Sequence, residues 1–291
     1  MNQRELSRRE FARLAGAGLL AGGVAVAHPA TITAGEVVER VQKHVGIPWN
    51  PKTYRDTFKI GTPDMEVKGI VSTFMSTFDI LQRSVKAGLN MIISHEPTFW
   101  SDADIVKDLG DDPLYRQKLD YALKNNLVVW RFHDHIHAMK PDGIFVGWNR
   151  ALTWDQYQVG DDQHLFILPR TMSLEEVARE VKKNLQTDSM RVIGDPKLPV
   201  SKVVRGSHGL AGNMSAVLEA DVLLVLEARE FDSIEWMRDT MLSGQKKGMI
   251  LMAHERGEQA GMDYCAEWLR TFITEVPVKF LSSNEPFWRP A

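Results

Sequence analysis

The chain has 291 residues, of which 44% are hydrophobic and 25% are charged. These proportions exclude a disordered or fibrous protein, and the length allows either one large globular domain or two smaller ones. The formal net charge of −3 excludes the strongly basic surface of a nucleic-acid-binding protein, and the single cysteine, Cys265, cannot form an internal disulfide.

Residues 1–27 have the order of features that is typical of an export signal. Two adjacent arginines, at positions 8 and 9, precede a short stretch rich in glycine and alanine, and the segment ends in small residues at 25–27. The apolar stretch is too short to span a bilayer. We therefore expect a twin-arginine signal peptide and a mature protein that is periplasmic or extracellular, without membrane contact after signal removal. The alternative is an amphipathic N-terminal helix that is not cleaved.

Residues 28–150 show predicted strands and helices in alternation. Thr33 and Glu36 have the spacing of a capping box, which predicts the start of a helix. Further along, apolar runs predict strands and apolar residues at helical spacing predict helices. In chain order these are a strand at 67–75, a helix at 78–89, a strand at 90–94, a helix at 112–126 and a strand at 127–132. This alternation predicts an α/β domain around a parallel sheet.

Residues 151–291 repeat the same alternation. The predicted elements are a helix at 173–185 capped by Ser173, strands at 191–196, 201–207 and 221–228, a helix at 231–244 and a strand that begins at 247. Gly257 favours a loop after this last strand. Neither half contains a glycine-rich phosphate-binding fingerprint. The expected fold class is therefore α/β, in two segments, 28–150 and 151–291.

Histidines and carboxylates follow three of the predicted strands. His95 and Glu96 follow the second strand, "HDHIH" (133–137) follows the third, and His254 follows the last, with Glu258 four residues later. The carboxyl ends of parallel strands open on one edge of a sheet, so these groups should lie together. Imidazole and carboxylate together suit zinc, iron and manganese better than calcium or magnesium. The alternative is that each histidine hydrogen-bonds only the end of its own strand.

The stretch "HDHIH" does not by itself define a ligand set. If it is extended, His133, His135 and His137 lie on one face and Asp134 on the other, and all three histidines cannot be assumed to bind one ion. The later "HERGE" lacks the second histidine of the zinc-protease helix. The sequence therefore indicates a metal site without fixing its ligands.

Three longer stretches resemble the Ngg-interacting-factor-three-like proteins, also known as GTP cyclohydrolase type-two homologues. They are "DTFKIGTPDMEVKGIVSTFMSTFDILQRSVKAGLNMIISHEPTFW", "RVIGDPKLPVSKVVRGSHG" and "GMILMAHERGE" with the later "EPFW". The resemblance covers almost the whole chain after residue 27. It implies two related α/β domains, a cleft between them that holds two metal ions, and assembly into a closed homo-oligomer, commonly a hexamer.

The resemblance also implies a ligand set. Family members use a His-His pair, an aspartate four residues after a histidine, and a late histidine with a glutamate four residues after it. Glu96 stands where the family has its second histidine, and His137 stands where the family has its aspartate, so the number of bound ions is one or two. The implied metal ligands are His95, Glu96, His137, His254 and Glu258, with His133 or Asp134 as further ligands or supporting groups.

These features favour an exported metal-dependent hydrolase that activates water with zinc, iron or manganese and acts on a small-molecule substrate. Glu96 is the expected catalytic base or bridging ligand. The alternative is a non-catalytic metal-binding protein that forms rings and interacts with other molecules. Arg205 and His208 follow another strand, where they could reach a substrate anion or lie in a solvated turn. The tryptophan-bearing segments are expected in the core or in subunit contacts.

Overall fold

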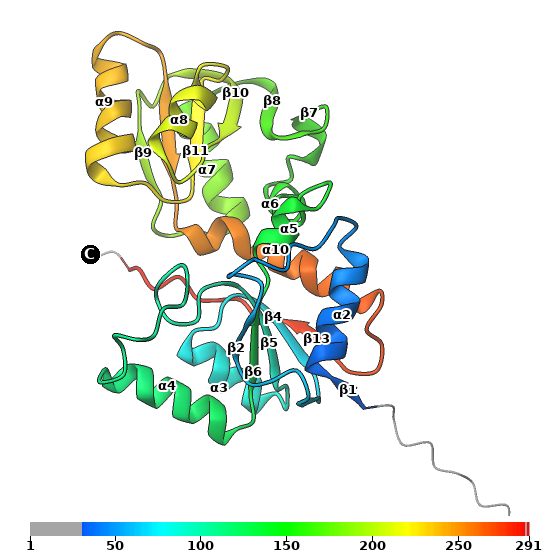
Figure 1. Cartoon of the computed structure of the whole chain (residues 1–291). Helices are drawn as coiled ribbons and strands as arrows, with labels where there is room; N and C mark the ends of the chain where they lie inside the picture. The colour runs from blue at the N-terminus through cyan, green and yellow to red at the C-terminus, as the bar shows by residue number, and fades with distance from the viewer. Residues whose placement is uncertain (1–30, 289, 291) are drawn as a thin grey trace, which may run out of the picture. The chain divides into compact units, whose positions relative to one another are not determined.

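The structure is a computed structural model that describes residues 31–288 and residue 290 (Figure 1). The expected export signal at 1–27 lies outside these residues. The described residues form an α/β fold that is built on two sheets and a short ribbon. The ribbon pairs β1 (Ile32–Thr33) with β3 (Glu66–Val67).

The first sheet has five strands in the order β13-β4-β5-β6-β2. Their bounds are Val278–Phe280 for β13, Ile70–Met75 for β4, Met91–Glu96 for β5, Val128–Arg131 for β6 and Phe58–Ile60 for β2. The strands from β13 to β6 are parallel, and β2 is antiparallel to β6 at one edge. The predicted strands at 67–75, 90–94 and 127–132 thus lie side by side in the centre of this sheet.

Helices cover both faces of the first sheet. On one face, α3 (Phe78–Lys86) and α4 (Pro113–Lys124) bury side chains such as Ile92. On the other face, α2 (Ala34–His44) and α10 (His254–Arg270) pack over side chains such as Ile93. Because both faces are buried, the central strands are almost continuously apolar.

The second sheet has six strands in the order β7-β8-β10-β11-β12-β9. Their bounds are Gln158–Val159 for β7, Asp162–Ser173 for β8, Pro199–Arg205 for β10, Val222–Val225 for β11, Gly248–Leu251 for β12 and Arg191–Ile193 for β9. The strands β10, β11 and β12 are parallel neighbours, and antiparallel strands flank them. The carboxyl ends of these three strands therefore share one edge.

The second sheet is also covered on both faces. One face packs against α6 (Gly143–Leu152) and α7 (Leu174–Leu185), and the other against α8 (Leu210–Val217) and α9 (Glu235–Leu242). The shorter helical turns are α5 (Asp134–Ala138), η1 (Asp155–Tyr157) and η2 (Glu230–Ile234). Within residues 31–288, no helix combines the length and the apolar character needed to cross a membrane.

Both predicted helix caps are confirmed. The Thr33 hydroxyl accepts a hydrogen bond from the Glu36 amide at 3.2 Å, and the Glu36 carboxylate accepts one from the Thr33 amide at 2.7 Å. Ser173 and Glu176 form the same reciprocal pair at the start of α7. Each box satisfies amide groups that the first turn of a helix leaves without intrahelical partners.

The C-terminal part of the chain differs from expectation in two ways. The segment after β12 is the start of α10 rather than a loop, because burial of Met262 and Cys265 against the first sheet stabilises the helix. Gly257 lets α10 lie close to Leu226, since a Cβ at position 257 would lie 2.0 Å from the Leu226 side chain. Strand β13 pairs with β4, so part of segment 151–291 belongs to the first sheet (Figure 1).

Helices α6 and α10 cross at unusually close range through two glycines. A Cβ on Gly147 would lie 2.1 Å from the carbonyl oxygen of Ala260, and a Cβ on Gly261 would lie 2.4 Å from Cα of Ile144. The hydroxyl of Ser72 in β4 donates to the carbonyl oxygen of Met262 at 2.6 Å. These contacts fix α10, and with it the histidine and glutamate of its first turns, against the first sheet.

Candidate metal centre

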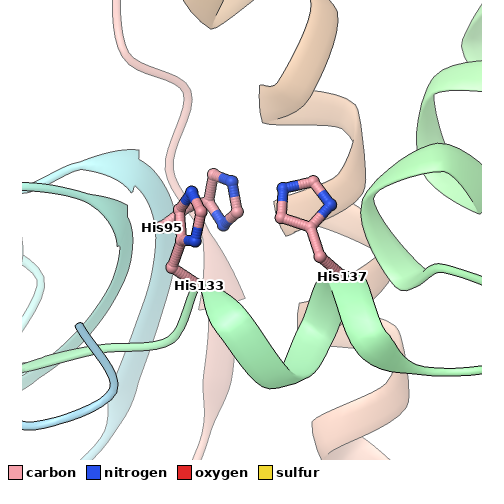
Figure 2. Close-up of side chains that lie close together, drawn as sticks. All are labelled: His95, His133 and His137. Atoms are coloured by element: carbon pink, nitrogen blue, oxygen red, sulfur yellow. The ribbon is translucent and has the colours of Figure 1, made fainter. Parts of the chain in front are cut away.

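The polar residues at the ends of β5, β6 and β12 meet around one cavity of about 840 Å³. His95 and Glu96 come from β5, His133 caps α5 and His137 lies within it just after β6, and His254 and Glu258 come from the start of α10. The three rings at positions 95, 133 and 137 gather at the centre (Figure 2), with one ligand atom of each within 4.8 Å of the others. The expected convergence of separate strand ends is thus present.

His95 lies at the buried end of the site. Its side chain has no exposure, and Nδ1 donates to the carbonyl oxygen of Phe132 at 3.2 Å. This bond fixes the tautomer and leaves Nε2 as a bare acceptor. Nε2 is buried and faces Glu258 Oε2 at 3.2 Å without the geometry of a hydrogen bond. A buried acceptor nitrogen in this state is suited to a cation.

His133 and His137 lie four residues apart on one side of α5, so "HDHIH" is helical and not extended. His133 Nδ1 lies 3.1 Å from Asp134 Oδ1, and His137 Nδ1 lies 2.8 Å from Asp142 Oδ2. Because a carboxylate only accepts, each Nδ1 donates and each Nε2 is left available. This orientation of a histidine by a carboxylate is usual among metal ligands.

The turn at α5 is held by Asp56, which sequence reasoning missed. Its buried carboxylate accepts from the backbone amides of His133, Asp134 and His135 at 2.6 to 2.9 Å. A carboxylate at the start of a helix satisfies the orphan amide groups there. Asp56 lies 77 residues before His133, so no local pattern of the sequence indicates the interaction.

His135 is occupied by the fold and does not face the cavity. Its Nδ1 lies 2.5 Å from Asp56, its Nε2 accepts from the Asn50 amide at 2.8 Å, and its ring stacks on Trp49 at 3.6 Å. Both ring nitrogens therefore have protein partners. His135 acts as a structural residue.

Glu96 is held by a buried cation. Arg131 has no exposure, and its Nη2 lies 3.0 Å from Glu96 Oε2. The other oxygen, Oε1, lies 3.7 Å from Nε2 of His133 and 3.7 Å from Nε2 of His254. One oxygen of Glu96 is thus directed at the cavity while the other is fixed.

His254 and Glu258 are one helical turn apart at the start of α10, which places both on one face. His254 Nε2 lies 2.7 Å from Glu258 Oε2. Burial alone would lower the pKa of His254, but the charges of Glu258 and Glu227 outweigh it and raise this pKa to about 10. Burial would raise the pKa of Glu258, but the positive charge of His254 holds it well below its usual value. An ion that binds at His254 Nε2 must therefore displace a proton.

His133 and His137 have opposite electrostatic surroundings. Burial, together with the neighbouring His95 and His137, lowers the pKa of His133 to about 2, so its ring is neutral. Burial also acts to lower the pKa of His137, but the hydrogen bond and charge of Asp142 outweigh it and raise this pKa above its usual value.

The six metal ligands expected from the sequence lie together, and their binding of metal stays a prediction. They are His95, Glu96, His133, His137, His254 and Glu258.

Glu227, which follows β11, was missed, although a carboxylate directly after an apolar strand is the same signal that marks Glu96. Arg205 is buried, with its guanidinium 3.6 Å from the ring centroid of Phe145, whereas His208 is exposed near Glu227. Trp148 and Trp154 are buried in the core, which is one of the two places, core or subunit contact, expected for the tryptophan-bearing segments.

Comparisons with known proteins agree with this architecture. Residues 27–286 match the sequence model of the family described as Duf34/NIF3 (NGG1p interacting factor 3). The fold is similar to the hypothetical protein SA1388 of Staphylococcus aureus, with 16% identity, a TM-score of 0.70, and coverage of 89% of this chain and 99% of that one. The NIF3-related protein of Bacillus cereus has 14% identity, a TM-score of 0.70 and coverage of 89% and 99%.

Reduced HcgD from Methanocaldococcus jannaschii is also similar, with 15% identity, a TM-score of 0.60 and coverage of 86% of this chain and 98% of that one. At such low identity these likenesses show the fold alone. No curated protein sequence matches the chain. The family match spans both sheets and every strand end that lines the cavity, and the chain therefore belongs to the Duf34/NIF3 family.

Proposed function

We propose that the protein is a metal-dependent hydrolase of a small molecule. The observation that carries this proposal is the set of three imidazoles at His95, His133 and His137. Each has its Nδ1 engaged by the protein, and each leaves Nε2 available beside the others. A polar cluster that served only to solvate strand ends would not need three matching tautomers.

The donor set fits a divalent transition ion. His95, His133, His137 and Glu258 would hold it, with Glu96 and His254 adjacent. Nitrogen-rich sets with a carboxylate suit zinc, iron or manganese, and the number of ions is one or two. When bound, such an ion acidifies a coordinated water and polarises the bond to be cleaved.

Glu96 is the proposed general base. Arg131 fixes Oε2 at 3.0 Å, so Oε1 is the oxygen that can take a proton from a water in the cavity. Because Arg131 holds the Glu96 carboxylate in place, less entropy is lost in orienting it for the proton transfer. The cavity of about 840 Å³, with Phe74 and Trp100 in its wall, has the volume of a small-molecule site.

The test is turnover that depends on metal. Chelator-treated protein would be assayed on carboxylic esters, phosphate esters and amides, before and after addition of zinc, manganese or iron(II). We expect activity on at least one class that chelator abolishes and metal restores, and a loss of about 100-fold or more in kcat for Glu96→Gln at unchanged metal content. The exposed Glu219 provides the matched control Glu219→Gln. Metal-loaded protein that turns over none of these classes at any rate above the metal-free protein contradicts the proposal.

The second candidate is a metal-binding protein without catalysis that acts through assembly. It is favoured by large apolar side chains that are exposed in the single chain, such as Phe231 at 76% and Trp288 at 79%. Full metal occupancy with no turnover, together with a stable oligomer, would favour this candidate over the hydrolase.

We also propose export and ring assembly. Fusion of residues 1–27 to a reporter should carry the folded reporter out of the cytoplasm, and the double change Arg8→Lys with Arg9→Lys should retain it inside. Light scattering of the protein from residue 28 onward is expected to give a closed oligomer, six chains in number. A mass close to that of one chain at micromolar concentration would contradict the assembly.

A further inference from the structure

A second group of metal-ligand side chains lies at the edge of the second sheet. His208 follows β10, Glu227 follows β11 and His254 follows β12. Since these strands are parallel neighbours, their carboxyl ends bring the three side chains to one edge. This is the same construction that places His95 and His133 at the edge of the first sheet.

The three side chains are within reach of one ion. Glu227 Oε2 lies 3.4 Å from His254 Nδ1, and Glu227 Oε1 lies 3.5 Å from His208 Nδ1. The two imidazole rings are 4.6 Å apart between centroids, and one donor atom from each residue lies within 4.8 Å of the others. Small shifts of side chains at the surface would bring these atoms to bonding distance.

His254 separates the two groups because its ring nitrogens face in different directions. Nε2 faces Glu258 at 2.7 Å in the buried centre, whereas Nδ1 faces Glu227. A donor set that includes Nδ1 of His254 is therefore distinct from the one built on His95, His133 and His137.

Solvent reaches this second group. The side chains of His208 and Glu227 are 51% and 60% exposed, so water could complete the coordination of an ion held there. His208, Glu227 and His254 line the same cavity of about 840 Å³ as the first group. Glu227 and His254 also line a neighbouring cavity of about 1010 Å³, whose other walls include Leu226, Met252 and Trp288. Two nitrogens and one carboxylate with open positions are typical of zinc or another divalent transition ion.

We propose that His208, Glu227 and His254, through Nδ1, form a separate surface site for a divalent transition-metal ion. The proposal does not depend on hydrolase activity, because it concerns only whether a metal ion binds at these three residues. In this arrangement the buried ion uses Glu258 with the three histidines of the first sheet, and the surface ion uses the outward nitrogen of His254.

Binding of cobalt(II) and zinc to metal-free protein tests the site. Titration followed by visible absorption for cobalt, and elemental analysis after desalting for zinc, would give the number of ions and their affinities. We expect His208→Asn and Glu227→Gln each to remove one ion per chain, or to weaken one binding step at least tenfold, and to leave the buried step intact. His95→Ala should do the reverse.

Matched controls are available on the same chain. His44→Asn changes an exposed histidine at the end of α2, whose ring stacks on Phe272. Glu219→Gln changes an exposed carboxylate before β11. Both variants should bind as many metal ions as the unaltered protein, with the same affinities. Because His208 and Glu227 are exposed, their variants should melt at the unaltered temperature. Unchanged stoichiometry and affinity in both variants overturns the proposal. An effect of Glu227→Gln alone also overturns it, since Glu227 would then act only by orienting His254.

Discussion

Arg131 and Glu96 form a charge pair in which the guanidinium has no exposure, with Nη2 at 3.0 Å from Oε2. Nε of the same guanidinium donates to the carbonyl oxygen of His95 at 2.9 Å, so Arg131 also supports the strand end that carries the site. The glutamate at the end of β5 is therefore matched by a buried cation.

A histidine in place of Glu96 should destabilise the metal-free protein. Among the described residues, Glu96→His leaves the exposed Asp102 as the one carboxylate partner of Arg131, and loss of one partner of a buried ion pair costs about 3–5 kcal/mol. Since Asp102 remains as a partner of Arg131, we expect the loss in free energy of unfolding, measured in urea, to lie near the lower end of this range. Glu96→Gln keeps an oxygen for Arg131 and should cost less. If Glu96→His were as stable as the unaltered protein, the ion pair would contribute little to stability.

The changes Glu96→His and His137→Asp should be coupled in metal affinity. His137→Asp alone places a new carboxylate beside Asp142, because Asp142 Oδ2 lies 2.8 Å from Nδ1 of His137. The site already contains the carboxylates of Glu96 and Glu258. Glu96→His removes one negative charge, so the double variant should bind metal better than the sum of the single losses predicts. Affinities for the four proteins provide the measurement. Losses that add within about 0.5 kcal/mol would mean that positions 96 and 137 do not share a site.

Gly147→Ala should disturb the metal centre from a distance. The new methyl group would meet the carbonyl oxygen of Ala260 at 2.1 Å and push α10 away from α6. Overpacking of this kind costs about 1–3 kcal/mol. We expect a lower urea midpoint and weaker metal binding, because α10 carries His254 and Glu258. Gly110→Ala is the control, since no atom lies within 4 Å of its new methyl group. Similar midpoints for the two variants would show that the helix crossing can adjust.

Lys118 should make the free energy of unfolding depend on pH in the alkaline range. Burial lowers its pKa from 10.5 to about 8, and its ammonium group lies 2.5 Å from the carbonyl oxygen of Thr98. Between these two values the unfolded chain holds a proton that the folded chain has lost, so this group's contribution to the free energy of unfolding rises as the pH increases.

Lys118→Met removes that contribution. The difference in unfolding free energy between the unaltered protein and this variant, measured in urea from pH 7 to 10.5, should shift in favour of the unaltered protein by up to about 3 kcal/mol. A difference that stays constant over this range would mean that Lys118 titrates in the folded protein as it does in water.

Much of the fold is predictable because its signals are local. The central strands of both sheets, the capping boxes at Thr33 and Ser173, and the meeting of His95 with His133 follow from apolar runs and from the geometry of parallel strands. No helix or strand was predicted for residues 143–172, although they contain α6 and most of β8.

The features that the sequence did not predict have non-local causes. The helical form of "HDHIH" depends on the carboxylate of Asp56, and the helix at His254 depends on burial of Met262 and Cys265 against the first sheet. Both interactions join residues that are far apart in the sequence or in different elements, so no short window contains them. His135, which has the same local setting as His133, is separated from the site only by its tertiary partners.

The pairing of β13 with β4 has a consequence for synthesis. The ribosome makes β4, β5 and β6 long before residues 278–280, so the edge of β4 stays unpaired until residues 278–280 have been made. An open strand edge is a template for pairing with another chain, which makes incomplete chains prone to aggregation. His95 and His133 are likewise made before α10 can supply Glu258. Under the proposed function, a cation that arrived before α10 was made would meet only part of the proposed ligand set.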